Sequence, residues 1–106
     1  SCGINYFNDF IQPKLKFKIP NSKELSILQN VVSEINKIDD SAEADVYQSA
    51  IFSVGKNSEF KDDIKSFFKL IYEVFFGQEN GPRLGSFIKI YTKNKTIELF
   101  NSKLNV

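Results

Sequence analysis

The chain has 106 residues, 42% of them hydrophobic, and this length allows one domain around a single hydrophobic core. It contains no histidine, no methionine and a single cysteine, which excludes most metal sites and the common nucleophile–base triads. The net charge of +1 is too balanced for the strongly basic footprint of many nucleic-acid-binding proteins, and no apolar stretch approaches the ~20 residues that span a bilayer. We therefore expect neither a membrane nor DNA as a partner.

The charges are unevenly distributed along the chain. Residues 1–33 carry a net charge of +2, residues 34–63 a net charge of −5, and residues 64–106 a net charge of +4. Such runs are usually solvated helix faces, so they identify no partner by themselves. Eleven phenylalanines and four tyrosines predict a core rich in aromatic side chains.

The first twenty residues are the least regular part of the sequence. An apolar cluster over residues 4–11 predicts a short helix that ends before Pro13. Lysines alternate strictly with apolar residues over 14–19, a pattern typical of an extended segment. Because the sequence begins at Ser1 and lacks methionine, we expect either a processed chain or a piece cut from a larger protein, and we favour the latter. We expect residues 1–20 to be a connector and residues 21–106 to be the folded domain.

Two helices are predicted in the first half of this domain. Asn21 and Glu24 have the spacing of a capping box, and Asp40 and Glu43 repeat that spacing before the second helix. The second helix is expected to end at Gly55 in a left-handed conformation. The inward face of the first helix is predicted to hold Leu25, Leu28, Val32, Ile35 and Ile38, and that of the second Val46, Ala50 and Ile51.

The third helix has the strongest apolar stripe, which runs from Ile64 to Phe75. Ser58 or Asn57 is expected to cap it, and Gly77 is expected to end it. Acidic residues at 59, 62 and 63 suit the positive end of the helix dipole. This helix is therefore predicted to be the centre of the core.

Two shorter helices are predicted in the last quarter of the chain. Pro82 is well placed at the first position of one helix, and Asn94 can cap the other. Apolar residues recur at helical spacing in both, at Leu84, Phe87, Ile88 and Tyr91 and then at Ile97, Phe100 and Leu104. The sequence therefore predicts an all-α fold, a compact bundle of four to five helices.

No group of residues has the pattern of a catalytic site. The carboxylate pairs Asp39-Asp40 and Asp62-Asp63 each lie near a predicted helix start, where capping and the helix dipole explain them. No glycine-rich loop has the phosphate-binding spacing with its lysine. We expect no catalytic residue, cofactor or metal ion within this chain.

Residues 71–88 read IYEVFFGQENGPRLGSFI, a helix that ends in Phe-Phe-Gly, a turn with Gly-Pro-Arg, and a helix with Phe-Ile. This run resembles the C-terminal end of class I lysyl-tRNA synthetases, the archaeal-type enzymes that some bacteria also use. The clear match covers about a fifth of the chain, and residues 5–17 are similar to the start of that family's last domain. Two departures are Glu73, where the family is often basic, and Thr92, where a glycine usually precedes the lysine.

The resemblance implies a parent enzyme that joins lysine to its tRNA with ATP and Mg in the cytoplasm. One catalytic signature of that family needs two histidines and the other a methionine, and this sequence contains neither residue type. The resemblance therefore places the catalytic domain upstream of this chain. What remains is similar to the helical-cage anticodon-binding domain of class I synthetases, whose partner here would be the anticodon end of tRNA(Lys).

An anticodon-binding domain needs cations for phosphates and exposed planar or polar groups for bases. The candidate residues are Arg83, Lys89, Lys93 and Lys95, with Gln78 and Asn80 in the preceding turn. Arg83 has an alternative role as the ion-pair partner of Glu79 or Glu73, and the lysines have one as solvated surface. Tyr91 offers a stacking surface, but its place on the apolar stripe favours a core position.

Two other readings of the chain remain open at this point. A helical protein–protein interaction module would receive a partner on its acidic middle or on an exposed apolar face. A scaffold domain would only rigidify the parent and would have no affinity for RNA. The segment that holds Lys14, Lys16 and Lys18 has two possible roles. It could follow an RNA backbone, or it could be the tether to the missing catalytic domain, and we favour the tether.

Overall fold

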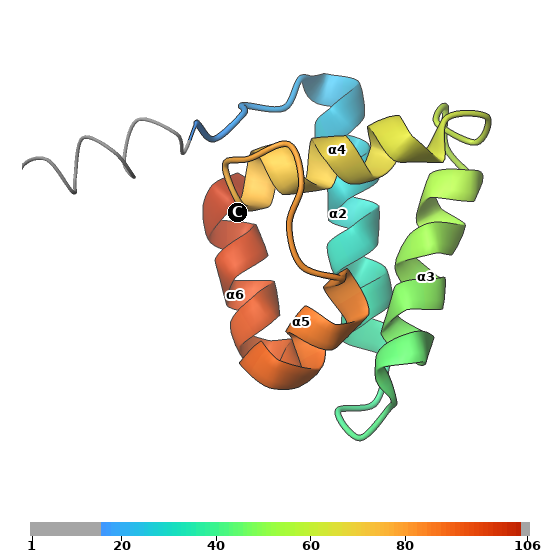
Figure 1. Ribbon diagram of the computed structural model, residues 1–106, viewed down its shortest axis with the longest axis vertical. Helices are drawn as coiled ribbons and strands as arrows, with labels where there is room; N and C mark the ends of the chain where they lie inside the picture. The colour runs from blue at the N-terminus through green and yellow to red at the C-terminus, as the bar shows by residue number, and fades with distance from the viewer. Residues whose placement is uncertain (1–15, 105–106) are drawn as a thin grey trace, which may run out of the picture.

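The computed structural model describes residues 16–104, which contain five α-helices and no strand (Figure 1). The helices are α2 (Ser22–Lys37), α3 (Ala44–Lys56), α4 (Ile64–Phe75), α5 (Leu84–Tyr91) and α6 (Lys93–Leu104). α2 packs against α3 and α6, α5 packs against α3 and α6, and α4 crosses one end of the bundle against α3 and α6. The predicted all-α bundle is confirmed, and the helix predicted over residues 4–11 lies outside the described residues.

α2 begins as the sequence predicts. Asn21 Oδ1 accepts a hydrogen bond from the Glu24 amide at 2.8 Å, and Glu24 Oε1 accepts one from the Asn21 amide at 3.0 Å. This reciprocal pair completes the capping box and fixes the first turn. The face that α2 buries is slightly rotated from the predicted one, because Leu25 and Ile38 are only partly buried. The buried residues are Leu28, Val31, Val32 and Ile35.

The start of α3 differs from the prediction. Glu43 stands at the N-cap position without a capping hydrogen bond from its side chain, so Asp40 and Glu43 form no capping box. The preceding turn is stabilised instead by Asp39, whose carboxylate accepts from the Ser41 amide at 2.9 Å and the Ser41 hydroxyl at 3.0 Å. The helix consequently turns Tyr47 into the core and leaves Val46, predicted to face inward, exposed.

The prediction for Gly55 was also wrong. Gly55 lies inside α3, which continues to Lys56, and it has no left-handed conformation. A Cβ atom at this position would lie 2.6 Å from Cδ2 of Phe67. The glycine therefore allows α3 and the aromatic ring on α4 to approach each other closely, a role that the local sequence does not show.

Asp63, rather than Ser58 or Asn57, caps α4. Its carboxylate accepts from the Ser66 hydroxyl at 2.7 Å and from the Ser66 amide at 3.3 Å. Gly77, with φ of +73°, follows the end of the helix, as predicted. The residues that α4 buries are Phe67, Leu70, Ile71, Val74 and Phe75.

Two details at α5 and α6 correct the sequence prediction. α5 starts at Leu84 with Arg83 at its N-cap, so Pro82 lies outside the helix and not at its first position. Thr92, with φ of +83°, separates α5 from α6 and accepts a hydrogen bond from the Lys95 amide at 3.3 Å. Asn94 is therefore inside the first turn of α6 and does not cap it.

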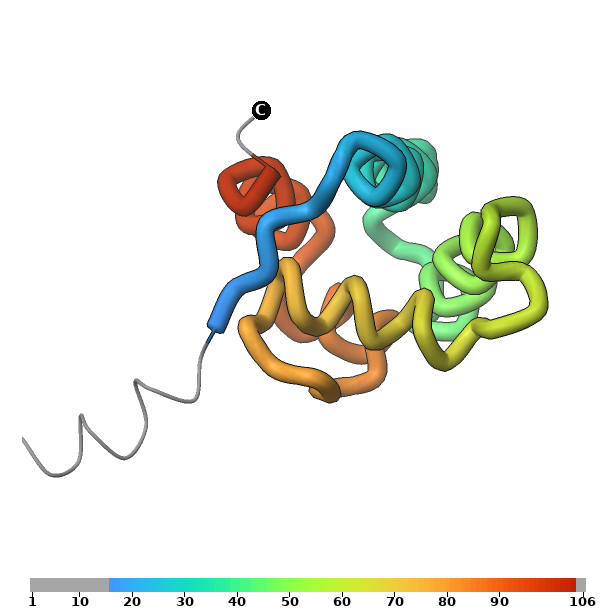
Figure 2. The backbone as a smooth tube through the Cα atoms, turned by 90° about the horizontal axis from the view of Figure 1, so that it is seen from above, coloured from blue at the N-terminus to red at the C-terminus, as the bar shows by residue number. Residues whose placement is uncertain are grey.

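Residues 16–20 are non-helical and lie along the end of α4, next to α6 (Figure 2). The Lys16 amide donates to the Gly77 carbonyl oxygen at 2.9 Å, and the Lys18 amide donates to that of Glu73 at 2.9 Å. The Phe17 ring lies against Gly77 and under the ammonium of Lys103, 3.7 Å from the ring centroid. These contacts fix the direction from which the chain enters the bundle.

The core is shared by all five helices, and aromatic side chains supply its largest members, namely Tyr47, Phe67, Phe75 and Phe100, as the composition predicts. Phe75 and Phe100 stack at its centre with ring centroids 3.8 Å apart. No described helix is long and apolar enough to cross a membrane. The buried apolar residues are Leu28, Val31, Val32, Ile35, Tyr47, Ile51, Phe67, Leu70, Ile71, Val74, Phe75, Leu84, Ile88, Phe100 and Leu104.

Candidate functional site

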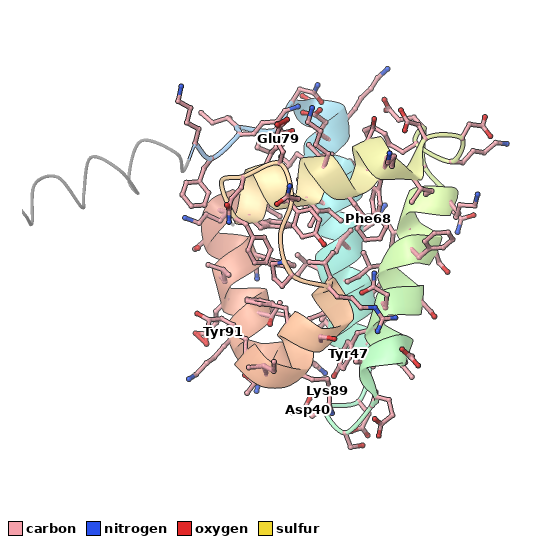
Figure 3. All side chains as sticks on the ribbon, in the orientation of Figure 1. Asp40, Tyr47, Phe68, Glu79, Lys89 and Tyr91 are labelled. Atoms are coloured by element: carbon pink, nitrogen blue, oxygen red, sulfur yellow. The ribbon has the colours of Figure 1, made fainter. Side chains whose placement is uncertain are left out.

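The residues that the sequence singles out fall into two groups at different ends of the bundle. Gln78 and Asn80 line a surface hollow next to the end of α4, together with Lys16. Lys89 and Lys93 line a second hollow between the start of α6 and the α2–α3 turn. The labelled side chains of Glu79 and Lys89 in Figure 3 mark these two ends. The chain therefore offers two separate polar surfaces.

Arg83 lies between the two groups, at the N-cap of α5, and is exposed. Its Nη2 atom lies 3.2 Å from Oδ1 of Asp45, in the first turn of α3. The partner differs from Glu79 and Glu73, the two acids that the sequence offered. Both side chains are more than half exposed, so the ion pair adds little to stability and leaves the guanidinium accessible to a second anion.

Lys93 has a structural role that its sequence position does not reveal. Its ammonium donates to the carbonyl oxygen of Ile38 at 2.6 Å and to that of Asn36 at 3.1 Å. Oδ1 of Asp40 lies 3.3 Å from the same nitrogen, and the Lys93 side chain is only 14% exposed. Lys93 thus occupies the negative C-terminal end of α2, and its charge is already compensated.

Lys89 and Lys95 are both exposed and form no ion pair with another residue of the 16–104 range. They lie on either side of the corner at Thr92, one on α5 and one in the first turn of α6. Of the predicted lysines, these two carry charge that is available to an outside anion.

The hollow near the end of α4 presents amide groups rather than net charge. The side chains of Gln78 and Asn80 are exposed and form no hydrogen bond with another described residue. Lys16 and Glu73 line the same hollow, and Glu79 on its rim forms an ion pair of 3.5 Å with Lys69. This surface can donate and accept hydrogen bonds without strongly attracting an anion.

Tyr91 is not a core residue, contrary to its expected place on the apolar stripe. It is the last residue of α5 and 41% of its surface is exposed. Its ring stacks on that of Phe87, one turn earlier, with centroids 5.0 Å apart and an angle of 24° between the planes. The helix ends at this residue, so no later turn covers the outer part of its ring.

The charges of the described residues are unevenly distributed among the helices. Residues 38–63, which comprise α3 and its flanking turns, contain seven carboxylates and two lysines. Residues 84–104, which comprise α5 and α6, contain four lysines and one carboxylate. α3 and α6 lie on opposite sides of the bundle (Figure 1). A polyanion is therefore attracted to α5 and α6 more than to α3, and the acidic segment approaches this side at Asp40, next to Lys93, and at Asp45, next to Arg83.

A groove of about 620 Å³ lies elsewhere, between α2 and α3. Lys23 is its single cation, whereas Glu34 and Glu59 supply two carboxylates. Its remaining lining is polar or weakly apolar, with Ile27 and Val54 as the larger apolar residues. The groove has neither the positive charge of an RNA site nor three carboxylates for a cation. Over residues 16–104, no cluster of acidic residues or cysteine is arranged to hold a metal ion.

Sequence comparison gives these surfaces a context. The chain is similar to lysine–tRNA ligases. It is 37% identical over 102 residues to the enzyme of Rickettsia felis, 36% identical to that of Rickettsia prowazekii and 33% identical to that of Rickettsia bellii. Each similarity covers 96% of this chain but only 19% of the ligase, so the chain spans about a fifth of the length of these relatives. No protein-family model and no solved structure matches the chain.

Two features of the candidate surface were not predictable from the sequence alone. The ion pair of Arg83 with Asp45 joins residues 38 positions apart, and the contact of Lys93 with α2 joins residues 55 positions apart. The exposure of Tyr91 had a local signal, since Thr92 stands where the resembling family has a helix-ending glycine. A helix that ends at Tyr91 leaves the outer part of its ring uncovered.

Proposed function

We propose that this chain is the anticodon-binding domain of a class I lysine–tRNA ligase and that its α5–α6 side receives the anticodon end of tRNA(Lys). The observation that carries the proposal is its similarity, at 33–37% identity over 96% of its length, to lysine–tRNA ligases. The class I subtype is supported by the run over residues 71–88, which resembles the C-terminal end of that class. The cytoplasm, where tRNA is charged, is the corresponding location.

The distribution of charge supports RNA as the ligand of this side. Lys89 and Lys95 carry uncompensated charge there, and the guanidinium of Arg83 is held only by a weak surface pair. Phosphate contacts from such side chains position an RNA without reading its bases. Gln78 and Asn80 lie at the other end, where their amides would contact bases or ribose hydroxyls.

The resemblance to class I enzymes implies that the reaction of the parent enzyme is carried out by groups outside this chain. Over residues 16–104, no cluster of acidic side chains is arranged to hold a metal ion, and the sequence contains no histidine. We therefore assign ATP, Mg and the catalytic residues to an upstream domain, to which residues 1–20 connect. The docked segment 16–20, with Phe17 held against Gly77, would transmit the position of that domain to the bundle.

The test is fluorescence anisotropy of the 106-residue chain with a labelled lysine-anticodon stem-loop and with a scrambled-loop control. Selective binding is expected, with an affinity that falls as salt rises from about 50 to about 200 mM. Lys95→Ala should reduce the slope of log affinity against log salt by about 0.7 to 0.9, the value for one phosphate contact.

Lys61→Ala is the matched control, because Lys61 is an exposed lysine on the acidic side of the bundle. It should leave both the affinity and the salt slope unchanged. Equal binding of the two stem-loops would reduce the domain to a clamp on the RNA backbone. Absence of binding to either loop at low salt would contradict the proposal and favour the scaffold or protein-interaction alternative.

A further inference from the structure

The end of α5 carries an aromatic surface that the proposed function does not by itself require. Tyr91 and Phe87 stack with ring centroids 5.0 Å apart, and 41% of the Tyr91 surface is exposed. The neighbouring residue, Ile90, is 85% exposed. Apolar surface in contact with water is unfavourable in free energy, so an exposed ring in this position gains stability when a partner covers it.

The ring of Tyr91 is held in place from behind. Phe87 packs edge-on against Phe76 at 5.0 Å, and Phe76 packs edge-on against Phe100 at 6.4 Å. Phe100 in turn stacks on Phe75 in the core. A continuous series of rings thus joins the buried centre of the bundle to its surface. Tyr91 is the outermost member of this series, and its orientation is set before any ligand arrives.

The hydroxyl group of Tyr91 distinguishes it from the other two described tyrosines. The Tyr47 hydroxyl donates to the Asp39 carbonyl oxygen at 2.8 Å, and the Tyr72 hydroxyl donates to that of Pro82 at 2.7 Å. The Tyr91 hydroxyl forms no hydrogen bond with another residue of the 16–104 range. It can therefore bond to a ligand without breaking a contact of the fold.

The charges near this end of α5 favour one class of ligand. Lys95 follows Tyr91 by four residues, across the corner at Thr92, and forms no ion pair with a described residue. Lys89 lies on another face of α5, next to Asp40 (Figure 3). A planar group with a negatively charged backbone matches an exposed aromatic ring at a helix end that is followed by an exposed lysine without an ion-pair partner among the described residues. Unpaired bases of single-stranded RNA have both properties, whereas an apolar protein segment does not need the lysine.

We propose that Tyr91, supported by Phe87, is a stacking platform for one unpaired base of the RNA, with Lys95 on an adjoining phosphate. This inference rests on the proposed function and names the group that would contact the base. Stacking contributes to affinity for every base, since every base has a planar face, so Tyr91 adds binding strength more than sequence selectivity.

The experiment replaces each uridine of the lysine-anticodon stem-loop in turn by 5-iodouridine and irradiates the complex with the 106-residue chain. Peptide mapping should find Tyr91 as the main cross-linked residue, at one loop position. Tyr91→Ala should weaken binding by about tenfold, the effect of losing one stacked base. Tyr91→Phe should retain most of the affinity, whereas Tyr91→Leu, which lacks an aromatic face, should not.

Phe52→Ala is the matched control, because Phe52 is a comparably exposed aromatic residue on the acidic α3 side. It should leave RNA binding unchanged. If the chain binds the stem-loop but Tyr91→Ala binds equally well and the cross-link falls elsewhere, the stacking inference is overturned and the proposed function stands. If Tyr91→Leu binds as tightly as the native chain, an apolar contact replaces stacking and the inference is likewise overturned. If the native chain binds no stem-loop, both fail together.

Discussion

Lys93 and Ile38 link the first and the last described helix: the ammonium of Lys93 on α6 donates to the Ile38 carbonyl oxygen at the end of α2. The distance is 2.6 Å, and the Asn36 carbonyl oxygen and the Asp40 carboxylate complete the site. One cation thus satisfies two carbonyl groups of a helix terminus that would otherwise need water.

Lys93→Met should therefore destabilise the domain. The substitution keeps the apolar length of the side chain and removes the charged donor, which contributes about 1.5–3 kcal/mol when it bonds to such groups. Urea unfolding monitored by circular dichroism would measure the loss. Lys95→Met, two residues along α6 and exposed, is the control and should change stability by less than about 0.5 kcal/mol. Equal stability of the two variants would contradict the capping role.

Gly55→Ala and Gly85→Ala should differ in severity because different atoms oppose the added methyl group. At Gly55 the obstacle is the ring of Phe67, a side chain that can shift, and the gain in helix propensity offsets part of the strain. At Gly85 the obstacle is the backbone carbonyl of Ala44 at the start of α3, which cannot move without separating α5 from α3.

We expect the free energy of unfolding to fall by about 1 kcal/mol in Gly55→Ala and by about 3 kcal/mol or more in Gly85→Ala. The double variant Gly55→Ala/Phe67→Leu should cost less than the sum of its two single substitutions, because the smaller side chain relieves the overlap. Thermal or urea unfolding of the four variants checks both statements. Additive losses at residues 55 and 67 would show that the ring is not the obstacle.

The contrast between Gly77 and Gly55 shows which features were readable from the sequence. Gly77 ends α4 through a local backbone conformation, and a glycine after an apolar stripe predicts it. Gly55 looks the same in sequence, but its role depends on Phe67 from another helix. The capping box of Asn21 and Glu24 was likewise local and predictable, whereas Asp40 was drawn into a contact with Lys93 instead of a cap.

The same reasoning applies to the candidate site. Sequence alone indicated which residues lie at turns and helix ends, and Arg83, Lys89 and Lys95 are exposed there as a binding role requires. It did not reveal that the two hollows are separated or that Lys93 is committed to α2. Those facts depend on how the helices pack, and packing brings together residues that are distant in the chain.

Asp63 should make the stability of α4 sensitive to acid. The Ser66 hydroxyl and the Ser66 amide both donate to its carboxylate. These hydrogen bonds, the one from the hydroxyl most, lower the pKa of Asp63 below its ordinary value of 3.8. A carboxyl group whose pKa is lower in the folded state stabilises the fold above its unfolded pKa. That contribution is lost as the pH falls through the folded pKa.

Asp63→Asn keeps an acceptor at the cap and removes the titrating group. When the pH is lowered from about 5 to about 2, a window that brackets the ordinary pKa of an aspartate, the variant should lose less stability than the native chain. Urea unfolding at a series of pH values gives the comparison. Asp62→Asn, an exposed neighbour that accepts no hydrogen bond from the described residues, should leave the acid limb of the curve unchanged. Parallel curves for native chain and Asp63→Asn would refute the assignment.

Asp45 should compete with RNA for the guanidinium of Arg83, which it faces at 3.2 Å across the start of α5. Asp45→Asn removes this competitor and one negative charge beside the proposed binding side, so the affinity for the lysine-anticodon stem-loop should rise by up to about fivefold, the equivalent of one exposed ion pair. Stability should change by less than about 1 kcal/mol, because both side chains are largely exposed. Anisotropy titrations at low salt measure the affinity.

Glu43→Gln is the control, because it removes a nearby exposed charge that is not paired with Arg83. It separates the release of Arg83 from the general effect of removing one negative charge. Equal gains from both substitutions would assign the effect to overall charge, and a loss of affinity with Asp45→Asn would show that the ion pair orients Arg83 for the RNA.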